Sequence, residues 1–355
     1  MIGSRLKLAR EAMGWSLREL ESAIDGLVTA QAIGKYERDE MMPSSKVLLK
    51  LASALSIPPE YLLSENQIAL EDVDFRRAPV NGGKDGRSID ARVIDEVDRY
   101  LALEAVVPGA TIPWHRPSAS EFFLSCVEDA EKAADKLRVF WKLGIDPIVS
   151  VTELLEDQGI KVIAIPLPED VSGSKAFATL RHGDPIPMIV VNSQHNGERQ
   201  RFTLAHELGH LVVDWKGASA KEHEKAADRF AGAFLVCKDM LEKVIGRSRT
   251  AITIGELIAV KRVFKVSLAA LAMRLKQLGI ITKTTFGKIW AILTKNGWTV
   301  PGAVEPEPVS AEQPSRAKRL ALRALAEGAI SESKVAELLN IRRRELNEML
   351  EFQPA

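Results

Sequence analysis

The pentapeptide His206-Glu207-Leu208-Gly209-His210 constrains this chain more than any other feature of its sequence. The apolar residues around it have the spacing of a helix that is buried on most sides. Because residues four apart share one face of a helix, the His206 and His210 imidazoles can reach the same metal ion. Buried histidines need polar partners, and Glu207 stands beside them as a proton acceptor. The pentapeptide therefore predicts a metal site capable of hydrolysis.

A third metal ligand is expected, because catalytic zinc sites usually take three protein ligands and leave one position open. The segment 221–236 has the pattern of a second helix with alanines on one face. That face can pack closely on the first helix and bring a carboxylate to the metal. The candidates are Glu222, His223, Glu224 and Asp228. A solvated surface charge remains the alternative interpretation for each carboxylate.

The stretches Thr203-Leu-Ala-His-Glu-Leu-Gly-His210 and Glu224-Lys-Ala-Ala-Asp-Arg-Phe-Ala231 together resemble the ImmA/IrrE family of metallopeptidases, over about residues 130 to 245. The resemblance implies that His206, His210 and Glu224 hold Zn²⁺, with Asp228 and His223 as alternates, and that Glu207 is the catalytic acid/base. It also implies an XRE-type repressor as substrate, either a partner or this chain's own N-terminal domain. Relatives often end the second helix with Leu-Met-Pro, whereas this chain has Leu235-Val-Cys-Lys238, which changes no ligand.

The region before the pentapeptide predicts a small sheet. A short helix is expected over 151–158, followed by strands over 160–165, 174–179 and 187–192. Packed on the two metal helices, this sheet would complete an α+β, zincin-like metallopeptidase domain. A strand beside the cleft could bind an extended peptide by main-chain pairing. The candidates for stabilising an oxyanion are Arg181, His182, His195 and His223.

The N-terminal residues carry an independent signal, that of an all-α helix-turn-helix domain. Two short helical segments, 16–24 and 29–37, flank the turn Asp25-Gly26. The apolar core expected for them consists of Leu17, Leu20, Ile24 and Ile33. Over about residues 2 to 64 the order of these residues, with Pro43 and Ile57, resembles the XRE family, which includes the DNA-binding domains of lambdoid phage repressors. The resemblance implies a double-stranded operator as partner, and a homodimer, because one helix reads too few base pairs for specificity.

The second helix of this motif is expected to enter the major groove. Alignment with the family points Thr29, Ala30, Gln31 and Lys35 towards the bases, where Gln can read adenine and Lys can reach guanine. Arg10, Arg18 and Arg38 are candidate phosphate contacts. Residues 1–65 hold eight basic and nine acidic side chains, so any positive potential must be local.

Composition divides the chain into several parts, since 355 residues exceed one typical domain. We expect a helix-turn-helix domain at 1–66, a linker and connecting helix at 67–117, the metallopeptidase domain at 118–298, a Pro-rich linker at 299–314 and a small helical module at 315–355. Within the last part, Ser331 to Leu346 again has helix-turn-helix rhythm, and Arg342–Arg344 could touch phosphate. A dimerisation or partner-docking module is the equal alternative.

The net charge is zero and there are two cysteines, Cys126 and Cys237. Bulk charge therefore indicates no partner, and the cysteine count suits a reducing cytoplasm without a disulfide framework. No apolar run approaches the length of a membrane span, so we expect no membrane partner.

Two functions follow as expectations. The first is a DNA-binding transcriptional regulator with a zinc-dependent endopeptidase domain that cleaves a repressor. The second is a transcriptional repressor or antitoxin of a toxin–antitoxin system, whose peptidase-like domain mainly binds a partner, such as a toxin, or senses a signal.

Overall fold

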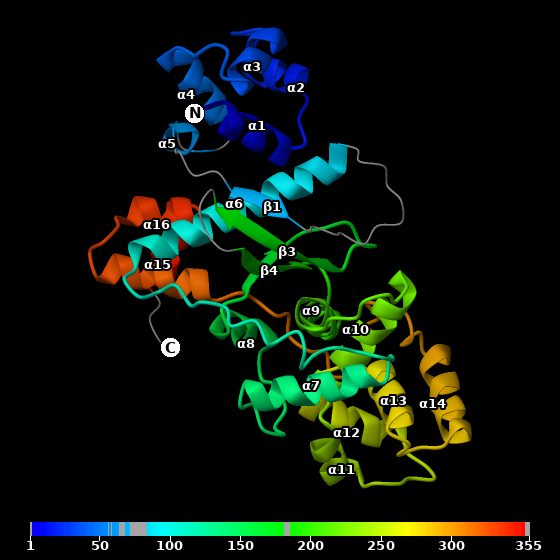
Figure 1. The fold of residues 1–355 in the computed structure, drawn as a ribbon. Helices are drawn as coiled ribbons and strands as arrows, with labels where there is room; N and C mark the ends of the chain where they lie inside the picture. Colours follow the sequence, from blue (N-terminus) through cyan, green and yellow to red (C-terminus); the bar gives the residue numbers. More distant parts are fainter. Residues whose placement is uncertain are drawn as a thin grey trace.

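The computed structural model describes residues 2–55, 57, 59–63, 68–71, 84–180 and 185–351, and Figure 1 shows their arrangement. In chain order the elements are α1 (Ile2–Ala12), α2 (Leu17–Ala23), α3 (Ala30–Glu37), α4 (Ser45–Ala54), α5 (Pro59–Leu63), β1 (Ile68–Glu71), α6 (Lys84–Val106), α7 (Asp129–Phe140), α8 (Val151–Asp157), β2 (Lys161–Ile165), β3 (Gly173–Leu180), β4 (Ile186–Asn192), α9 (Gly197–Val212), α10 (Ala220–Leu235), α11 (Lys238–Ile245), α12 (Ile254–Phe264), α13 (Leu268–Gln277), α14 (Lys283–Lys295), α15 (Arg316–Ala326), α16 (Glu332–Leu338) and α17 (Arg343–Leu350).

The first five helices form a separate bundle at the top of Figure 1. Ser16 begins α2 with a capping box that includes Glu19, and the Thr29 hydroxyl accepts the Ala32 N–H at the start of α3. Three of the four residues expected in its core, Leu20, Ile24 and Ile33, are completely buried. The fourth, Leu17, is partly buried against them. The predicted apolar core is therefore confirmed.

A four-stranded sheet with the order β1-β3-β4-β2 lies at the centre of the molecule. β3 pairs antiparallel with both β1 and β4, and β2 pairs parallel with β4. The three predicted strands are confirmed, with bounds that differ by at most one residue at either end. β1 was not predicted, because its four residues fall within the expected linker at 67–117.

The two faces of the sheet are covered by different helices. Successive side chains of a strand point to opposite faces. Val162, Ile189 and Val191 therefore meet α9 on one face. Ile163, Met188 and Val190 alternate with them and pack against α6 on the other face. Figure 1 shows α6 above the sheet and α9 below it.

Helix α6 corrects our division of the chain, since it is a core element and not a connection. Its residues Val93 and Val97 are completely buried against the sheet. The other side of α6 receives α1, and Arg5 of α1 forms a buried ion pair with Asp98 at 2.7 Å. Residues 74–83 of the flexible linker expected from the sequence lie outside the described residues.

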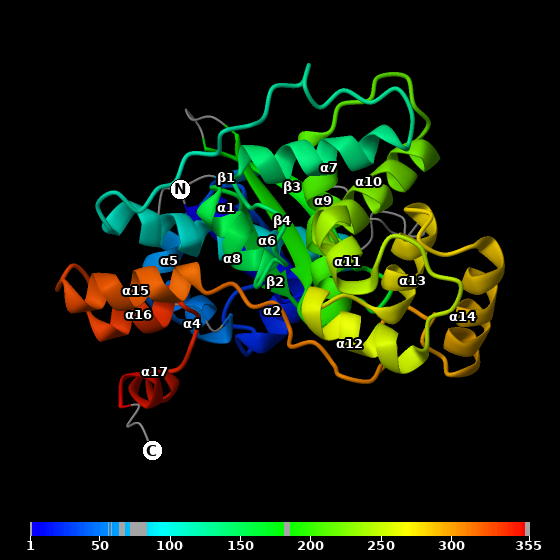
Figure 2. The same ribbon diagram turned by 90° about the horizontal axis from the view of Figure 1, so that it is seen from below.

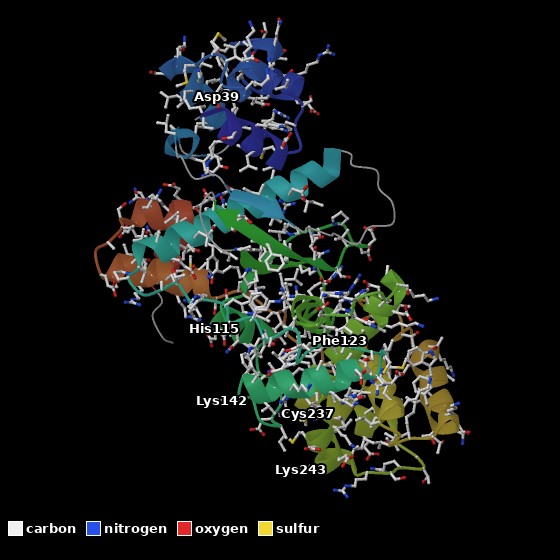
Figure 3. All side chains as sticks on the ribbon, viewed as in Figure 1. Asp39, His115, Phe123, Lys142, Cys237 and Lys243 are labelled. Atoms are coloured by element: carbon white, nitrogen blue, oxygen red, sulfur yellow. The ribbon has the colours of Figure 1, made fainter. Side chains whose placement is uncertain are left out.

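The sequence also predicts a helix from about Ala119 to Leu143, but α7 begins only at Asp129. The segment before α7 is not helical, because its main chain pairs with the residues that follow α9. The Leu124 N–H donates to the Asp214 carbonyl and the Asp214 N–H donates to the Phe122 carbonyl, at 2.9 and 3.1 Å. Tertiary pairing thus overrides the helical pattern here, next to the Phe123 labelled in Figure 3.

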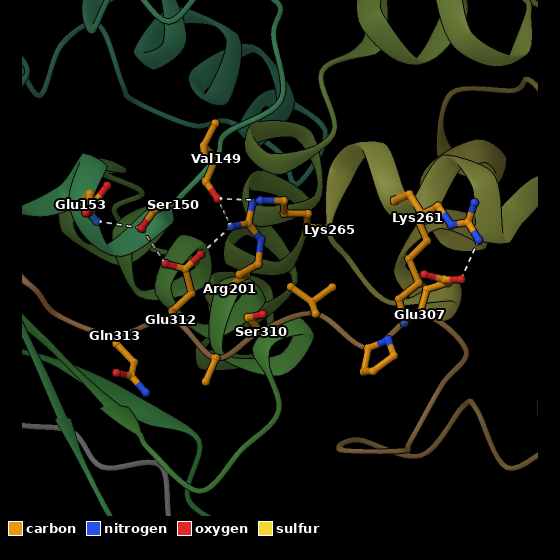
Figure 4. A pocket seen from close by; sticks show the side chains of 14 residues that line it. Val149, Ser150, Glu153, Arg201, Lys261, Lys265, Glu307, Ser310, Glu312 and Gln313 are labelled. Atoms are coloured by element: carbon orange, nitrogen blue, oxygen red, sulfur yellow. Dashed lines mark hydrogen bonds and ion pairs between the residues drawn. The ribbon is translucent and has the colours of Figure 1, made fainter. Parts of the chain in front are cut away.

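The Pro-rich segment 299–314 is a fixed strap and not a free linker. Glu305 is buried and accepts the Lys261 ammonium at 2.9 Å. Glu312 binds Arg201 and accepts the N–H groups of Val151 and Thr152 at the start of α8, as Figure 4 shows for its Arg201 and Ser150 contacts. Burial opposes ionisation of Glu312, but Arg201 and these N–H groups lower the pKa of its carboxyl below the usual value. The strap therefore belongs to the packed domain.

A glycine marks where this strap crosses the start of α9. A Cβ on Gly197 would lie 2.2 Å from the Ser310 carbonyl oxygen, so no larger residue fits. The same strap walls a cavity of about 660 Å³ (Figure 4). None of the residues lining that cavity belongs to the His-Glu-x-x-His segment.

The C-terminal helices α15 and α16 also pack on α6, and α17 packs on α16. Their shared core joins Leu103 of α6, and Val107 directly after this helix, to Leu320, Ala321 and Val335. Helix α6 therefore carries the N-terminal bundle, the sheet and the C-terminal module.

Cys126 is exposed and Cys237, labelled in Figure 3, is buried, and neither forms a disulfide. No helix among the described residues is both long enough and apolar enough to cross a membrane.

Candidate metal centre and nucleic-acid interface

Helix α9 is buried on nearly every side, as expected for a helix through the middle of a domain. Asn196 begins it, and its side chain accepts the Arg199 N–H at 3.0 Å. Leu204, Ala205 and Leu208 face the core, while His206 and Glu207 are buried polar residues. The polar pair is therefore held by packing and has little freedom to move.

Helix α10 crosses α9 closely because small residues meet at the crossing. A Cβ added to Gly209 would lie 3.1 Å from a ring carbon of Phe230. Ala227 and Ala231 are buried on α10, in agreement with the predicted small-residue face. This close approach brings Glu224 over the histidine pair.

The structure brings His206, His210 and Glu224 together. One donor atom from each lies within 4.8 Å of the others. The two Nε2 atoms are 3.1 Å apart, and the Glu224 carboxylate oxygens lie 3.8 Å from His206 Nε2 and 3.6 Å from His210 Nε2. Two imidazoles and one carboxylate are a donor set that suits Zn²⁺. Glu224 is 40% exposed, so this side of the cluster is open to solvent.

The alternates for the third ligand have other positions. Asp228 Oδ1 lies 2.8 Å from His206 Nδ1, where a carboxylate fixes the ring and leaves Nε2 for a metal. His223 packs its ring against Trp215, with centroids 6.0 Å apart. Glu222 caps α10 through the Ser219 N–H at 2.8 Å, and the bonds from Ser219 lower the pKa of its carboxyl.

Glu207 is oriented by the sheet. Its Oε2 accepts the main-chain N–H of Lys175 in β3 at 3.0 Å. In the described part of the chain, β1 pairs only with residues 177–180 of β3. The hydrogen bond from Lys175 to Glu207 therefore lies on β3 just beyond the last residue that pairs with β1. The carboxylate therefore stands at the junction of the histidine pair and the edge of β3.

A cavity of about 330 Å³ adjoins the cluster. His210 and His223 line it, together with three basic residues, Arg116, Lys175 and Lys216. Among the oxyanion candidates that the structure describes, only His223 lines this cavity. His195 is buried elsewhere, 3.1 Å from the Glu169 carbonyl, and Arg181 and His182 lie outside the described residues.

Sequence reasoning missed Arg116, Lys175 and Trp215. Arg116 and Trp215 lie in irregular segments before α7 and after α9, and Lys175 contributes to Glu207 through its main chain. No local pattern marks such positions, because their proximity arises from the tertiary fold.

The N-terminal bundle presents α3 to solvent with the expected side chains. Gln31 and Lys35 are exposed, Thr29 is exposed at the N-cap, and Ala30 is half-buried. Arg18 is exposed near them on α2. Arg38 is exposed as well but pairs with Glu40 at 2.7 Å.

Arg10 has a different role from the phosphate contact we expected. It is buried, its Nε donates to Glu37 at 2.6 Å, and its Nη1 donates to the Trp15 carbonyl at 2.6 Å. An arginine that is held inside the bundle by a carboxylate is unavailable to DNA, so it leaves the set of proposed contacts.

Models of two known protein families match the two regions of the chain that contain these residues. Residues 6–62 match the model of the helix-turn-helix family, and residues 155–276 match the model of the IrrE N-terminal-like domain. The chain is thus a helix-turn-helix protein of XRE type, and it also carries an IrrE/ImmA-like domain.

A curated relative is the HTH-type transcriptional regulator ImmR of Bacillus subtilis (strain 168). It is 27% identical over 81 residues, which are 22% of this chain and 62% of ImmR. The likeness therefore spans less than two thirds of that relative.

Proposed function

We propose that this protein is a DNA-binding transcriptional regulator whose IrrE/ImmA-like domain is a zinc-dependent endopeptidase with a zincin-like active site. The observation that carries the proposal is the convergence of His206, His210 and Glu224 beside the oriented carboxylate of Glu207. The name of ImmR supports a role in regulation.

The three clustered residues would hold Zn²⁺, which when bound supplies Lewis-acid activation of water and of the scissile carbonyl. Asp228 orients His206 through Nδ1. Glu207 accepts the proton from the attacking water and passes it to the leaving amine. His223 and the basic residues lining the adjoining cavity supply hydrogen-bond donors and positive charge for a developing oxyanion.

The edge of β3 is the proposed site for the peptide. A peptide that adds to a strand edge gains main-chain hydrogen bonds along its length. At Lys175 this edge lies within one hydrogen bond of Glu207, so a peptide there passes the catalytic carboxylate.

The chain's own β1 favours a substrate that resembles the region after a helix-turn-helix domain. β1 follows the N-terminal bundle and already pairs antiparallel with β3, with Glu71 opposite Phe177. An extended segment of a repressor can pair in the same way. A partner repressor and this chain itself are therefore the two substrates to compare.

The experiment is an intact-mass assay of the zinc-loaded chain, alone and mixed with an XRE-type repressor encoded nearby. We expect cleavage by the wild type and none by Glu207→Gln, because the amide keeps the shape but cannot accept the proton. Zinc-loaded wild type that cleaves neither protein would contradict the peptidase and favour a partner-binding repressor or antitoxin.

A further inference from the structure

The C-terminal module has the plan of a second helix-turn-helix unit. α16 and α17 contain seven and eight residues, the same lengths as α2 and α3 of the N-terminal bundle. The four residues 339–342 join α16 to α17. A turn of this length between two packed helices is typical of the motif.

The turn is sharp because Asn340 adopts a left-handed conformation, with φ of 51°. Asparagine tolerates this region better than most residues, since its short side chain can bond locally. Leu339 and Ile341 flank it and pack against the module core, where Leu346 of α17 is completely buried. One side of α17 is thus fixed against α15 and α16.

Three arginines lie at the exposed start of α17, with Arg342 at the N-cap and Arg343 and Arg344 in the first turn. Arg342, Arg343 and Arg344 are all exposed, and Asn347 follows them on the same helix. Figure 2 shows α17 projecting at the lower left, away from the sheet and the metal helices. Arginine binds phosphate and guanine, and asparagine can read adenine.

Charge favours DNA over a protein partner. Residues 315–351 hold eight basic and six acidic side chains, whereas residues 1–65 hold eight and nine. Arg343 lies 3.5 Å from Glu332 and Arg344 lies 2.9 Å from Glu348. The side chains of Arg343 and Arg344 are 69% and 89% exposed. Ion pairs this exposed contribute little to stability, so DNA phosphates can replace the two carboxylates.

We propose that this module is a second duplex-DNA-binding unit, in which Arg342–Arg344 contact backbone phosphates at the groove that α17 faces. Helix α6 joins it to the first unit, because α1 packs on α6 near Asp98 and the module packs on it near Leu103 and Val107. One protomer would then cover two stretches of DNA. This inference goes beyond the proposed function and does not require peptidase activity.

The test measures DNA binding of the full chain against salt. Fluorescence anisotropy with a random duplex of about 40 bp, over roughly 50 to 200 mM KCl, gives the slope of log affinity against log salt. Replacing Arg342, Arg343 and Arg344 by alanine should lower the magnitude of this slope by about 2 to 3, since each phosphate contact contributes about 0.9. The affinity at low salt should fall at least about tenfold.

The matched control replaces Lys283, Lys288 and Lys295, which are exposed on α14, by alanine and should leave the slope unchanged. The arginine substitutions are also compared in a Gln31→Ala/Lys35→Ala background, so that a failure of the N-terminal unit is seen separately. Equal slopes for the wild type and the arginine variant would overturn the proposal. So would a loss of dimers by light scattering without a change of slope, which would assign the module to self-association.

Discussion

At the residue scale, we expect Asp228 to orient the His206 ring and not to bind the metal itself. Its carboxylate lies 2.8 Å from His206 Nδ1, and its side chain is 60% exposed. We predict that Asp228→Asn weakens zinc binding by about 10- to 100-fold without abolishing it, as is usual when the partner of a metal-bound histidine is lost. Competition with a chromophoric chelator measures the affinity. An unchanged affinity would contradict this role.

The two arginines Arg10 and Arg18 give a second residue-scale prediction. Arg10→Ala should lower the free energy of unfolding by about 3 to 5 kcal/mol, because it leaves the buried Glu37 without its cation. Arg18→Ala should leave stability unchanged and lower the magnitude of the salt slope of DNA binding by about 1. Thermal denaturation and anisotropy titrations distinguish them; the reverse pattern would restore Arg10 as a phosphate contact.

The sequence predicted local features of the site better than its surroundings. The spacing of His206 and His210 predicts a common helical face whatever the rest of the fold. The alanines of α10 predicted that this helix crosses α9 closely. Whether Glu224 or Asp228 is the third candidate ligand depends on the exact rotation of α10 about its axis, which the sequence does not give. The part played by Lys175 could not be predicted, because its N–H meets Glu207 only after the sheet and α9 have packed.

At the element scale, β1 is the feature whose register is most readily tested. Ala69 lies opposite Thr179, and opposite residues of an antiparallel pair lie at the Cα separation that a disulfide needs. In a Cys126→Ser background, Ala69→Cys/Thr179→Cys should therefore cross-link under mild oxidation, as detected by peptide mass mapping. Ala69→Cys/Ala178→Cys is the control, since neighbouring residues of β3 point to opposite faces. Preferential cross-linking of the control would refute the register.

Glu156 of α8, which contacts the start of the C-terminal module, is expected to make the stability of the folded state depend on pH. Burial raises the pKa of its carboxyl to about 7, although it accepts the Arg316 N–H at 3.2 Å. A carboxyl with a raised pKa in the folded state destabilises that state as pH rises from about 4.5 to 7, because the unfolded chain ionises first. The effect is on the order of 3 kcal/mol at most.

Glu156→Gln removes this ionisation. Its thermal midpoint should change less between pH 5 and pH 8 than that of the wild type, and should be higher at pH 8. Glu153→Gln, on the same helix and exposed, serves as the control. The account of Glu156 fails if wild type and Glu156→Gln lose stability equally over this range.

At the scale of the whole molecule, composition predicted separate domains joined by linkers, whereas in the structure the linking segments pack against the domains. The prolines of residues 299–314 indicated a linker, yet Glu305 and Glu312 fix that segment through buried cations. Likewise α6 has the charged pattern of a connecting helix, and its burial arises from three partners far apart in sequence. Single-segment patterns carry no information about such partners.

This shared scaffold joins the helix-turn-helix unit and the proposed metal centre in one molecule, and the proposed function depends most on the metal. The deciding measurement is the zinc content of the purified chain by elemental analysis and native mass spectrometry, for the wild type, Glu222→Gln and Glu224→Gln. Glutamine preserves the cap at position 222, so that variant changes a carboxylate of the same helix outside the cluster. We expect one zinc ion per chain in the wild type and Glu222→Gln, and loss of zinc in Glu224→Gln. Full zinc occupancy in Glu224→Gln, or none in the wild type, would contradict this expectation.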